Sequence, residues 1–501
     1  MKKVLLSLAA IAALASCSND DLGNDPNNPL NGAATFVQFS LDRNATRAVT
    51  DPEIDITAAG LYIFSAGVLE GQVEIASGQS EAIATSVGAK EILILANTKN
   101  NWNEAGIGKA FPSFETGATI ATVRAALEAI NVNNPYLTTP VADGLNFVDQ
   151  TLAGNGFVMT TSTVVTVPEG GTAEAPKELF VPVYRAGSKI ALGVDFTTIN
   201  TTPSRKKIDG NISAPNFALV QTSKSIPLGR QYYALGVSPF DPIDGTTVTN
   251  PAPEINSDKT FTGAIEVAED GLGYKHLHNY NELKDAADET TLNTNAWKAS
   301  ETLANNTTTP LVLEKFLFIP ENVVAGVLDG NVTRGETTFS ALKVTYAPTT
   351  GEMNDGETIN AGTSFWAIQH KVTRKLATIA DAEGVITRVK FFSDSDKALA
   401  FQGANTGKLP SADYQIVEFK SGLMYYRVDL TNAKHSATKD KHSILRNSKY
   451  LVDVNNVNDY GAPSMTDLVI DPEKPVEEVA NIKVTIKVVE YNEIATTPDL
   501  G

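Results

Sequence analysis

Residues 480–491 read Ala480-Asn-Ile-Lys-Val-Thr-Ile-Lys-Val-Val-Glu-Tyr491. Aliphatic residues recur there at every second position and polar residues separate them; the four aliphatic residues are Ile482, Val484, Ile486 and Val488. A period of two indicates a β-strand with one buried face. Because a lone strand of this kind is not stable in water, the stretch predicts a sheet edge that it joins, in its own domain or in a neighbouring molecule.

The rest of the chain repeats short β-type runs between clusters of Gly, Pro, Asn, Asp and Thr. Such spacing is typical of β-sandwich domains. We therefore predict an all-β fold with strands at residues 35–41, 59–65, 91–96, 157–167, 179–184, 189–195, 311–319, 339–347, 364–370, 414–419, 422–430, 450–457 and 482–489. Helical patterning is confined to residues 122–132 and 281–288, with Thr122 and Asn281 as candidate N-caps.

Composition also indicates how the chain is divided. A chain of 501 residues is long enough for two or three domains with hydrophobic cores. A boundary is predicted near residues 168–190, where a loop rich in Gly and Pro is followed by two separate apolar runs. Residues 197–310 have weak periodicity and predict long loops. Residues 459–478 are rich in Pro and acidic residues, and predict an extended linker before the last strand.

The N-terminus carries an export signal. Lys2 and Lys3 supply a positive region, residues 4–14 supply a short apolar run, and Leu-Ala-Ser-Cys17 follows. The apolar run is too short to span a membrane, which takes about 20 residues. Leu-Ala-Ser-Cys resembles a lipobox, which implies removal of residues 1–16 and a lipidated Cys17 as the new N-terminus. The alternative is an ordinary cleaved signal with a chance cysteine.

Charge and cysteine content exclude some classes of partner and fold. The net charge is −18 and no basic stripe offsets it, so we expect no nucleic-acid partner. Cys17 is the only cysteine, so the exported part rests on a hydrophobic core rather than on disulfides. The polar residues 18–29 predict a solvated tether. Acidic residues just after a lipidated cysteine resemble the surface-export signals of Bacteroidetes lipoproteins, which implies a cell-surface location.

A second alternating strand lies near the N-terminus. Val37, Phe39 and Leu41 share one face of residues 35–41. The next residues are polar and include Arg43 and Arg47, without a strand pattern. Exposed loops of this kind are where proteases cut. The residues alone leave a solvated loop open as the alternative.

The two ends of the chain form a matched pair. Cutting after Arg47 would remove the tether and the first strand, and would open an apolar groove. A neighbour's residues 482–488 could fill that groove by β-strand addition. Because one end accepts and the other donates, the contact would be head-to-tail and would propagate as a fibre. The alternative, equally open from periodicity, is that the last strand pairs within its own domain.

Several motifs, taken together and in order, resemble a known family. They are Leu14–Cys17, Arg47-Ala48 after a first strand, residues 88–97 (GAKEILILAN), residues 184–192 (YRAGSKIAL) and residues 444–461 (ILRNSKYLVDVNNVNDYG). This order resembles the type V pilins of Bacteroidales, the FimA and minor-fimbrium shaft-subunit superfamily.

The resemblance implies two transthyretin-like β-sandwich domains with a C-terminal donor-strand extension. The implied segments are a signal peptide (1–16), a lipidated propeptide with a displaceable first strand (17–47), an N-terminal sandwich (48–185), a C-terminal sandwich (186–458), and a linker with the donor strand (459–501). It also implies maturation by an Arg-specific trypsin-like protease. The scissile bond carried onto this sequence is Arg47–Ala48, with Arg43–Asn44 as second choice.

The implied role is that of a structural shaft subunit, first an outer-membrane lipoprotein precursor and then part of an extracellular fimbrium. The implied partners are identical subunits head-to-tail, anchor and tip subunits, the protease, and the outer membrane through the lipid. The displaced residues would be Val37, Phe39 and Leu41, and the donor residues would be Ile482, Val484, Ile486 and Val488. The alternative is a non-polymerising surface lipoprotein that acts as an adhesin or glycan-binding module.

No pattern in the sequence points to catalysis. It has no Gly-x-Ser-x-Gly, phosphate-binding glycine loop or zincin motif, so we expect neither an enzyme nor a cofactor. His276 and His278 would share a strand face, but no Cys or carboxylate completes a metal-ligand spacing. Two acidic turns, residues 354–357 (NDGE) and 393–396 (SDSD), could bind calcium weakly, although solvated turns are the commoner use. We therefore expect no metal.

Overall fold

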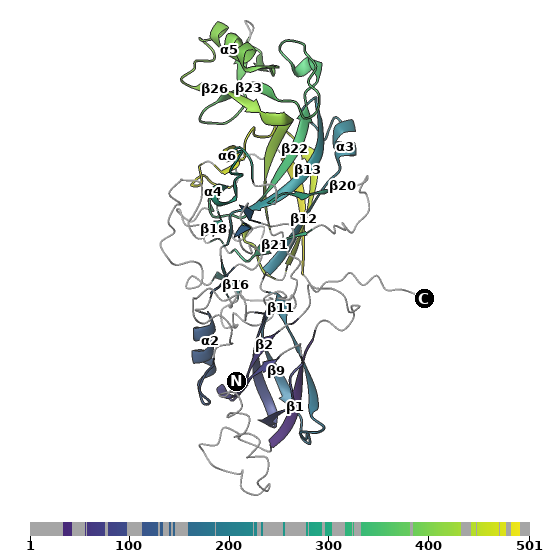
Figure 1. Ribbon diagram of the computed structural model, residues 1–501, viewed down its shortest axis with the longest axis vertical. Helices are drawn as coiled ribbons and strands as arrows, with labels where there is room; N and C mark the ends of the chain where they lie inside the picture. Colours follow the sequence, from purple (N-terminus) through teal and green to yellow (C-terminus); the bar gives the residue numbers. More distant parts are fainter. Residues whose placement is uncertain are drawn as a thin grey trace, which may run out of the picture. The chain divides into compact units, whose positions relative to one another are not determined.

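The computed structural model describes residues 34–42, 56, 58–75, 79–97, 113–128, 131–133, 140–141, 144–145, 159–185, 187–223, 225–227, 232–233, 254–255, 277–278, 280–292, 296–302, 316–322, 324, 332–380, 384–431, 442–446, 448–469, 471–476 and 482–490. These residues form two compact units. About half of them lie in β-strands and few lie in helices, so the prediction of an all-β fold is confirmed (Figure 1).

The described residues of unit 1 include the first strands of the chain and helix α2. Its elements are β1 (Ala34–Asp42), β2 (Ala59–Ser65), β3 (Val68–Ile75), β4 (Ile83–Ser86), β5 (Gly88–Ala96), α2 (Ile120–Glu128), β6 (Asn131–Asn133), β9 (Met159–Val167), β10 (Lys177–Pro182), β11 (Tyr184–Arg185), β15 (Ser225–Pro227), β16 (Tyr232–Tyr233) and β17 (Glu254–Ile255).

Two main sheets make up unit 1. The larger has the order β11-β9-β5-β2-β3, and the smaller has the order β10-β1-β4. Strand β1 runs parallel to β10 and antiparallel to β4. The central strands β2 and β5 have apolar runs that are buried at consecutive positions, as expected for strands that are covered on both faces. The short ladders β6–β15 and β16–β17 complete the described part of the unit.

Unit 2 holds the remaining elements. They are β7 (Pro140–Val141), β8 (Gly144–Leu145), β12 (Gly187–Val194), α3 (Phe196–Thr201), β13 (Asn211–Val220), β14 (Thr222–Ser223), β18 (Leu277–His278), α4 (Tyr280–Leu283), β19 (Lys298–Ala299), β20 (Glu301–Thr302), β21 (Phe316–Pro320), β22 (Phe339–Ala347), η3 (Thr350–Glu352), β23 (Phe365–His370), β24 (Thr378–Ala380), β25 (Ile386–Arg388), α5 (Ser395–Ala404), β26 (Tyr414–Phe419), η4 (Lys420–Gly422), β27 (Leu423–Asp429), β28 (Ser448–Val457), α6 (Thr466–Val469) and β29 (Ile482–Glu490).

Unit 2 is a β-sandwich. One sheet has the order β20-β12-β28-β29, with β21 also paired to β12, and the other has the order β19-β13-β22-β27. Both sheets contribute to one hydrophobic core, with Leu192 and Val452 from the first and Leu219 and Phe339 from the second. Burial of this shared core is the main force that holds the two sheets together.

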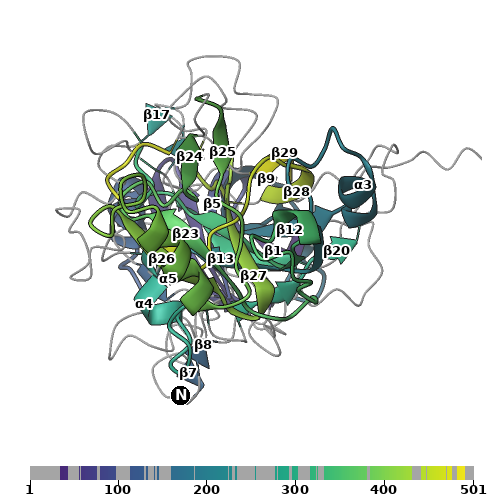
Figure 2. The same ribbon diagram turned by 90° about the horizontal axis from the view of Figure 1, so that it is seen from above.

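The segment between β22 and β27 extends beyond the two sheets of the sandwich, and we call it the excursion. It contains the β23–β26 and β24–β25 ladders and α5, which lie together in Figure 2. Its small core includes Ile368, Phe392 and Leu409. Beneath it the buried Glu352 carboxylate accepts hydrogen bonds from Tyr346 Oη at 2.5 Å and from Tyr460 Oη. Tyr346 Oη in turn accepts from the backbone N–H of Gly210 at 2.8 Å, so this network joins the excursion to the sandwich.

The predicted strands are all present, with bounds shifted by a few residues. The prediction of long loops in residues 197–310 was wrong in one important place, because β13 is a core strand there. Its first half is polar and Pro215 interrupts it, at a bulge where the register with β22 shifts between Ser213 and Asn216. Proline is tolerated in strands at such bulges, so the composition concealed the strand.

The structure corrects the predictions for both helices. Helix α2 begins at Ile120, and Thr119 Oγ1 accepts the N–H of Thr122 at 3.2 Å; the cap is therefore Thr119 and not Thr122. Helix α4 has only four residues, Tyr280–Leu283, and Asn281 lies inside it. It stops early because Asp285 Oδ1 accepts the N–H groups of Ala287 and Asp288, which gives the backbone a turn in place of another helical turn.

The predicted linker at residues 459–478 is packed along its described part. Met465 and Val469 are buried in the core of unit 2, and Val476 is also buried. Proline and acidic residues suggested an extended tether, but the apolar residues among them reach the sandwich. No helix within the described ranges is long and apolar enough to cross a membrane.

We expect Tyr346→Phe to destabilise unit 2 by about 1–3 kcal/mol, because it leaves the buried Gly210 N–H and Glu352 carboxylate each short of a partner. Equilibrium urea unfolding measures this change. Tyr414→Phe is the matched control, since its hydroxyl has no hydrogen bond among the described residues. Equal stability of the two variants would contradict a structural role for the network.

Candidate functional site

Strand β1 turns one face into the core of unit 1. Val37 and Phe39 are 0% exposed and Leu41 is 4% exposed. These are the three residues that the alternation placed on one face. Thr35 is also fully buried, so the inward face has four positions. Sequence reasoning missed Thr35 because a polar residue at a strand end carries no burial signal.

Both backbone edges of β1 are paired. Six of its residues are in parallel register with β10, from Val37 to Asp42, and four are in antiparallel register with β4, from Ala34 to Val37. Beyond β4, Ser80 continues the second edge: Phe39 N–H donates to Ser80 Oγ at 2.8 Å, and Ser80 N–H donates to Phe39 O at 2.9 Å. Removing β1 would therefore expose two unpaired strand edges and an apolar groove.

Gly171 contacts the first residues of β1 through its backbone. Gly171 N–H donates to Thr35 Oγ1 at 2.9 Å, and Phe36 N–H donates to Gly171 O at 3.2 Å. A Cβ atom built on Gly171 would lie 2.0 Å from Phe36 O, far inside van der Waals contact. Only glycine allows the loop to approach β1 this closely.

The neighbouring strand β4 is anchored independently of β1. Lys90 Nζ and Glu70 Oε2 form an ion pair at 2.8 Å, with side chains 1% and 2% exposed. Glu70 Oε1 also accepts the N–H of Ser86, the last residue of β4, at 2.6 Å, and Lys90 donates to Ser65 Oγ at 2.8 Å. Breaking a buried, hydrogen-bonded pair costs about 3–5 kcal/mol, so this network fixes one wall of the β1 site.

The C-terminal strand β29 occupies a sheet edge in unit 2. It pairs antiparallel with β28 and is the last strand in the order of its sheet. The four aliphatic positions are in register with core residues of β28: Ile482 with Val457, Val484 with Val454, Ile486 with Val452 and Val488 with Tyr450. In the isolated chain β29 thus completes its own domain, which is the alternative that periodicity left open.

Other predicted site residues fall outside the described ranges. These are Cys17, Arg43, Asn44, Arg47 and Ala48. His276 lies outside them as well, and His278 Nδ1 is 2.7 Å from Glu282 Oε2.

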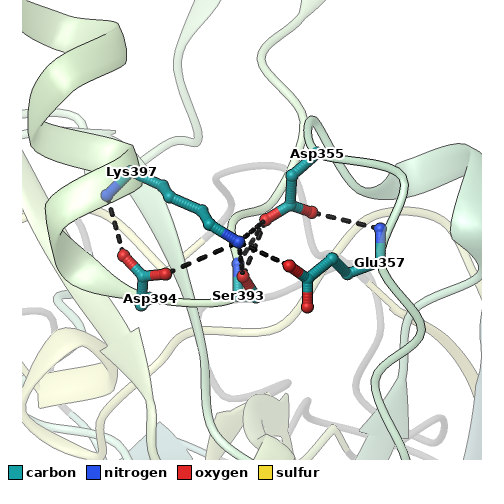
Figure 3. Close-up of polar contacts among 5 residues, drawn as sticks. All are labelled: Asp355, Glu357, Ser393, Asp394 and Lys397. Atoms are coloured by element: carbon teal, nitrogen blue, oxygen red, sulfur yellow. Dashed lines mark hydrogen bonds and ion pairs between the residues drawn. The ribbon is translucent and has the colours of Figure 1, made fainter.

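The two acidic turns come together around one lysine (Figure 3). Lys397 Nζ is 2.9 Å from Asp355 Oδ2 and 2.6 Å from Glu357 Oε1, and it donates to Ser393 Oγ at 2.7 Å. Hydrogen bonds from Ser393 and Lys397 outweigh burial and lower the pKa of Asp355 to about 2. The ammonium group thus takes the position between the carboxylates that a calcium ion would need. No group of three or more His, Cys, Asp or Glu side chains in the described ranges is placed to hold a metal ion.

No protein-family model matches the sequence, and no curated protein matches it. Among solved structures, a fimbrilin (FimA) from Porphyromonas gingivalis W83 is 14% identical, with a TM-score of 0.38 over 91% of this chain and 97% of that chain. A protein assigned to cell adhesion from Parabacteroides distasonis is 13% identical, with a TM-score of 0.41 over 92% and 99%. A C-terminally truncated tip fimbrial protein from Porphyromonas gingivalis is 12% identical, with a TM-score of 0.33 over 90% and 98%. The structural neighbours are thus fimbrial and cell adhesion proteins at low sequence identity.

We expect Gly171→Ala to destabilise unit 1 by about 1–3 kcal/mol, because the new methyl group forces the loop away from Phe36. Gly71→Ala is the control, since a Cβ there meets nothing within 4 Å. Hydrogen exchange of the β1 amides reports the change locally. Unaltered protection of β1 in Gly171→Ala would show that the close approach is not needed.

Proposed function

We propose that the chain is a structural shaft subunit of a cell-surface fimbria. It is exported as a lipoprotein on Cys17, matured by Arg-specific cleavage at Arg47–Ala48, and polymerised when a neighbour's β29 replaces β1. The observation that carries this proposal is the position of β1. It is a central strand with a fully buried face, and the candidate cleavage segment follows directly after its last residue, Asp42.

Cleavage at Arg47 would detach all of β1 in one piece. The next described residue of unit 1 is Ile56, shortly before β2. Strand β4 would keep its place, since Lys90 and Glu70 hold its end without help from β1. The product would be a preformed groove with two open backbone edges.

The last strand matches the groove in length and in pattern. Strands β1 and β29 each have nine residues. The groove has four inward positions at a period of two, occupied by Thr35, Val37, Phe39 and Leu41. The donor offers four aliphatic residues at the same period, namely Ile482, Val484, Ile486 and Val488.

Side-chain burial alone does not decide the exchange. Four aliphatic side chains contribute roughly 6–12 kcal/mol, and ordering a disordered strand costs about 1–2 kcal/mol for each residue. The strand ladders matter as well. In its own unit β29 pairs with one strand, β28, at nine positions, whereas β1 pairs with β10 at six positions and with β4 at four. A neighbour's β29 in the groove would therefore keep about as many ladder positions as it gives up, and it would cover the two edges that cleavage leaves open, which favours the polymer.

The second candidate function is a surface lipoprotein that acts as an adhesin or glycan-binding module and does not polymerise. The pairing of β29 with β28 favours it, because the chain then satisfies its own sheet edge without a neighbour. The two functions differ in the fate of residues 17–47.

Digestion of the full chain with an Arg-specific trypsin-like protease tests the proposal. We expect mass spectrometry to find a new N-terminus at Ala48, and electron microscopy to find filaments that give a ladder on gels. The double variant Arg43→Lys/Arg47→Lys keeps both charges but removes both candidate sites, so it should stay intact and monomeric. A wild-type chain that is cut at Arg47 but never polymerises, or a double variant that forms filaments, would contradict the proposal.

A further inference from the structure

Unit 2 contains a cavity that strand exchange does not use. It has a volume of about 170 Å³ and lies where the turn after β23 meets β27, α6 and the segment that follows β28. That volume is well above the roughly 10–15 Å³ that one ordered water needs and below the roughly 300 Å³ of pockets for drug-sized ligands. The cavity therefore suits a small ligand, such as one sugar residue.

The cavity is locally cationic in a protein of net charge −18. Its lining includes five Lys or Arg residues and four Asp residues. Three of the carboxylates lie within 3 Å of a cationic partner: Asp429 with Arg427 at 2.6 Å, Asp459 with Arg388 at 2.8 Å and Asp471 with Lys474 at 2.9 Å. The fourth, Asp467, has no cationic group this close among the described residues.

Arg374 lines this cavity, and its guanidinium has few partners among the described residues. Its charged neighbour is Asp467, 3.8 Å away, and its buried Nε has no hydrogen-bond partner in the structure. A buried donor without an acceptor is costly, and a bound ion, ligand or water is one way in which a folded protein satisfies such a group. The backbone at Arg374 has a positive φ of 57°, and the Arg374 carbonyl accepts a hydrogen bond from Gln369 Nε2 at 2.9 Å.

Asp467 is the complementary feature. Burial raises the pKa of this carboxyl group, and the hydrogen bond from Gln369 Nε2 to Asp467 Oδ2 is long, at 3.4 Å. Its oxygens therefore keep acceptor capacity for a ligand that donates. At the rim, Val372 is 68% exposed and provides an apolar contact. The cavity thus presents one anion-binding group, one hydroxyl-binding group and one apolar surface.

We infer that this cavity binds a sugar acid, such as a uronic acid residue of a polysaccharide. The sugar carboxylate pairs with the fork of the Arg374 guanidinium, which matches carboxylates bidentately. The ring hydroxyls donate to Asp467, and the ring lies against Val372. A neutral sugar would leave Arg374 without an anion. Any anion on Arg374 is repelled by Asp467, but the hydroxyl groups of a sugar acid donate to Asp467 and offset this repulsion, so the pair of residues selects a ligand with both groups.

Titration of the full chain with D-galacturonate, followed by NMR, tests this inference, with D-galactose and inorganic phosphate as comparison ligands. We expect galacturonate to bind and both comparison ligands to bind at least about tenfold more weakly. Arg374→Met should weaken galacturonate binding by about tenfold or more. Lys371→Met is the matched control, because it removes one positive charge from the same turn but does not line the cavity, and it should bind within about twofold of the wild type.

A second variant keeps the test decisive if Arg374→Met does not fold. Asp467→Ala removes hydroxyl acceptors and one negative charge, so it should weaken binding of galacturonate but strengthen binding of phosphate. The inference is overturned if galactose or phosphate binds as well as galacturonate. Unchanged galacturonate affinity in either cavity variant would also overturn it, as would the absence of galacturonate binding to the wild type. None of these outcomes depends on polymerisation, so they leave the shaft proposal standing.

Discussion

Every strand inside a sheet has two backbone edges to satisfy, and in this protein the first strand of the chain is such a strand. The parallel ladder to β10 and the antiparallel ladder to β4 enclose β1, and its four inward side chains are buried. Unit 1 cannot lose β1 and remain satisfied, because an apolar groove with two open edges is a template for another strand. The tight approach of Gly171 and the Lys90–Glu70 pair both serve this one site.

The same constraint gives the C-terminal strand its significance. Strand β29 ends a sheet and has one ladder, whereas the site of β1 has two. The two places are close in the number of ladder positions, which are nine between β29 and β28 and six and four between β1 and its two neighbours. They differ because β1 is enclosed on both edges and β29 on one. Proteolysis of the segment after β1 therefore acts as the switch in the proposed function. In that proposal it empties a site with two strand edges, which the donor strand of a neighbour then fills.

The sequence was informative about strands and poor at distant pairings. Alternation and β-propensity located β1, β22 and β29 closely, because burial of one face imposes a period of two. Strand β13 was not predicted, because a bulge and a proline break that period. The two units also interleave: β7 and β8 belong with unit 2, whereas β15 to β17 belong with unit 1, and a discontinuous unit leaves no local mark in composition.

For the candidate sites, too, local patterns could be recognised in the sequence, whereas contacts between distant residues could not. Val37, Phe39 and Leu41 could be assigned to one face from the sequence alone. The meeting of Arg374 with Asp467, and of two acidic turns around Lys397, depends on residues about 40 to 90 positions apart, which no short pattern relates. Arg374 in particular stands in an ordinary polar turn, and its sequence neighbours do not indicate its contact with Asp467.

A reversible disulfide between β28 and β29 can test whether β29 leaves its own sheet to enter a neighbouring subunit. Lys449 and Val489 are paired across β28 and β29, at the separation that a disulfide requires, and cleavage at Arg47 removes Cys17, the only native cysteine. Filament formation by the cleaved Lys449→Cys/Val489→Cys variant is then measured before and after reduction. The account predicts no filaments while the disulfide is intact and filaments once it is reduced. Filaments that form equally well in the oxidised state would contradict it.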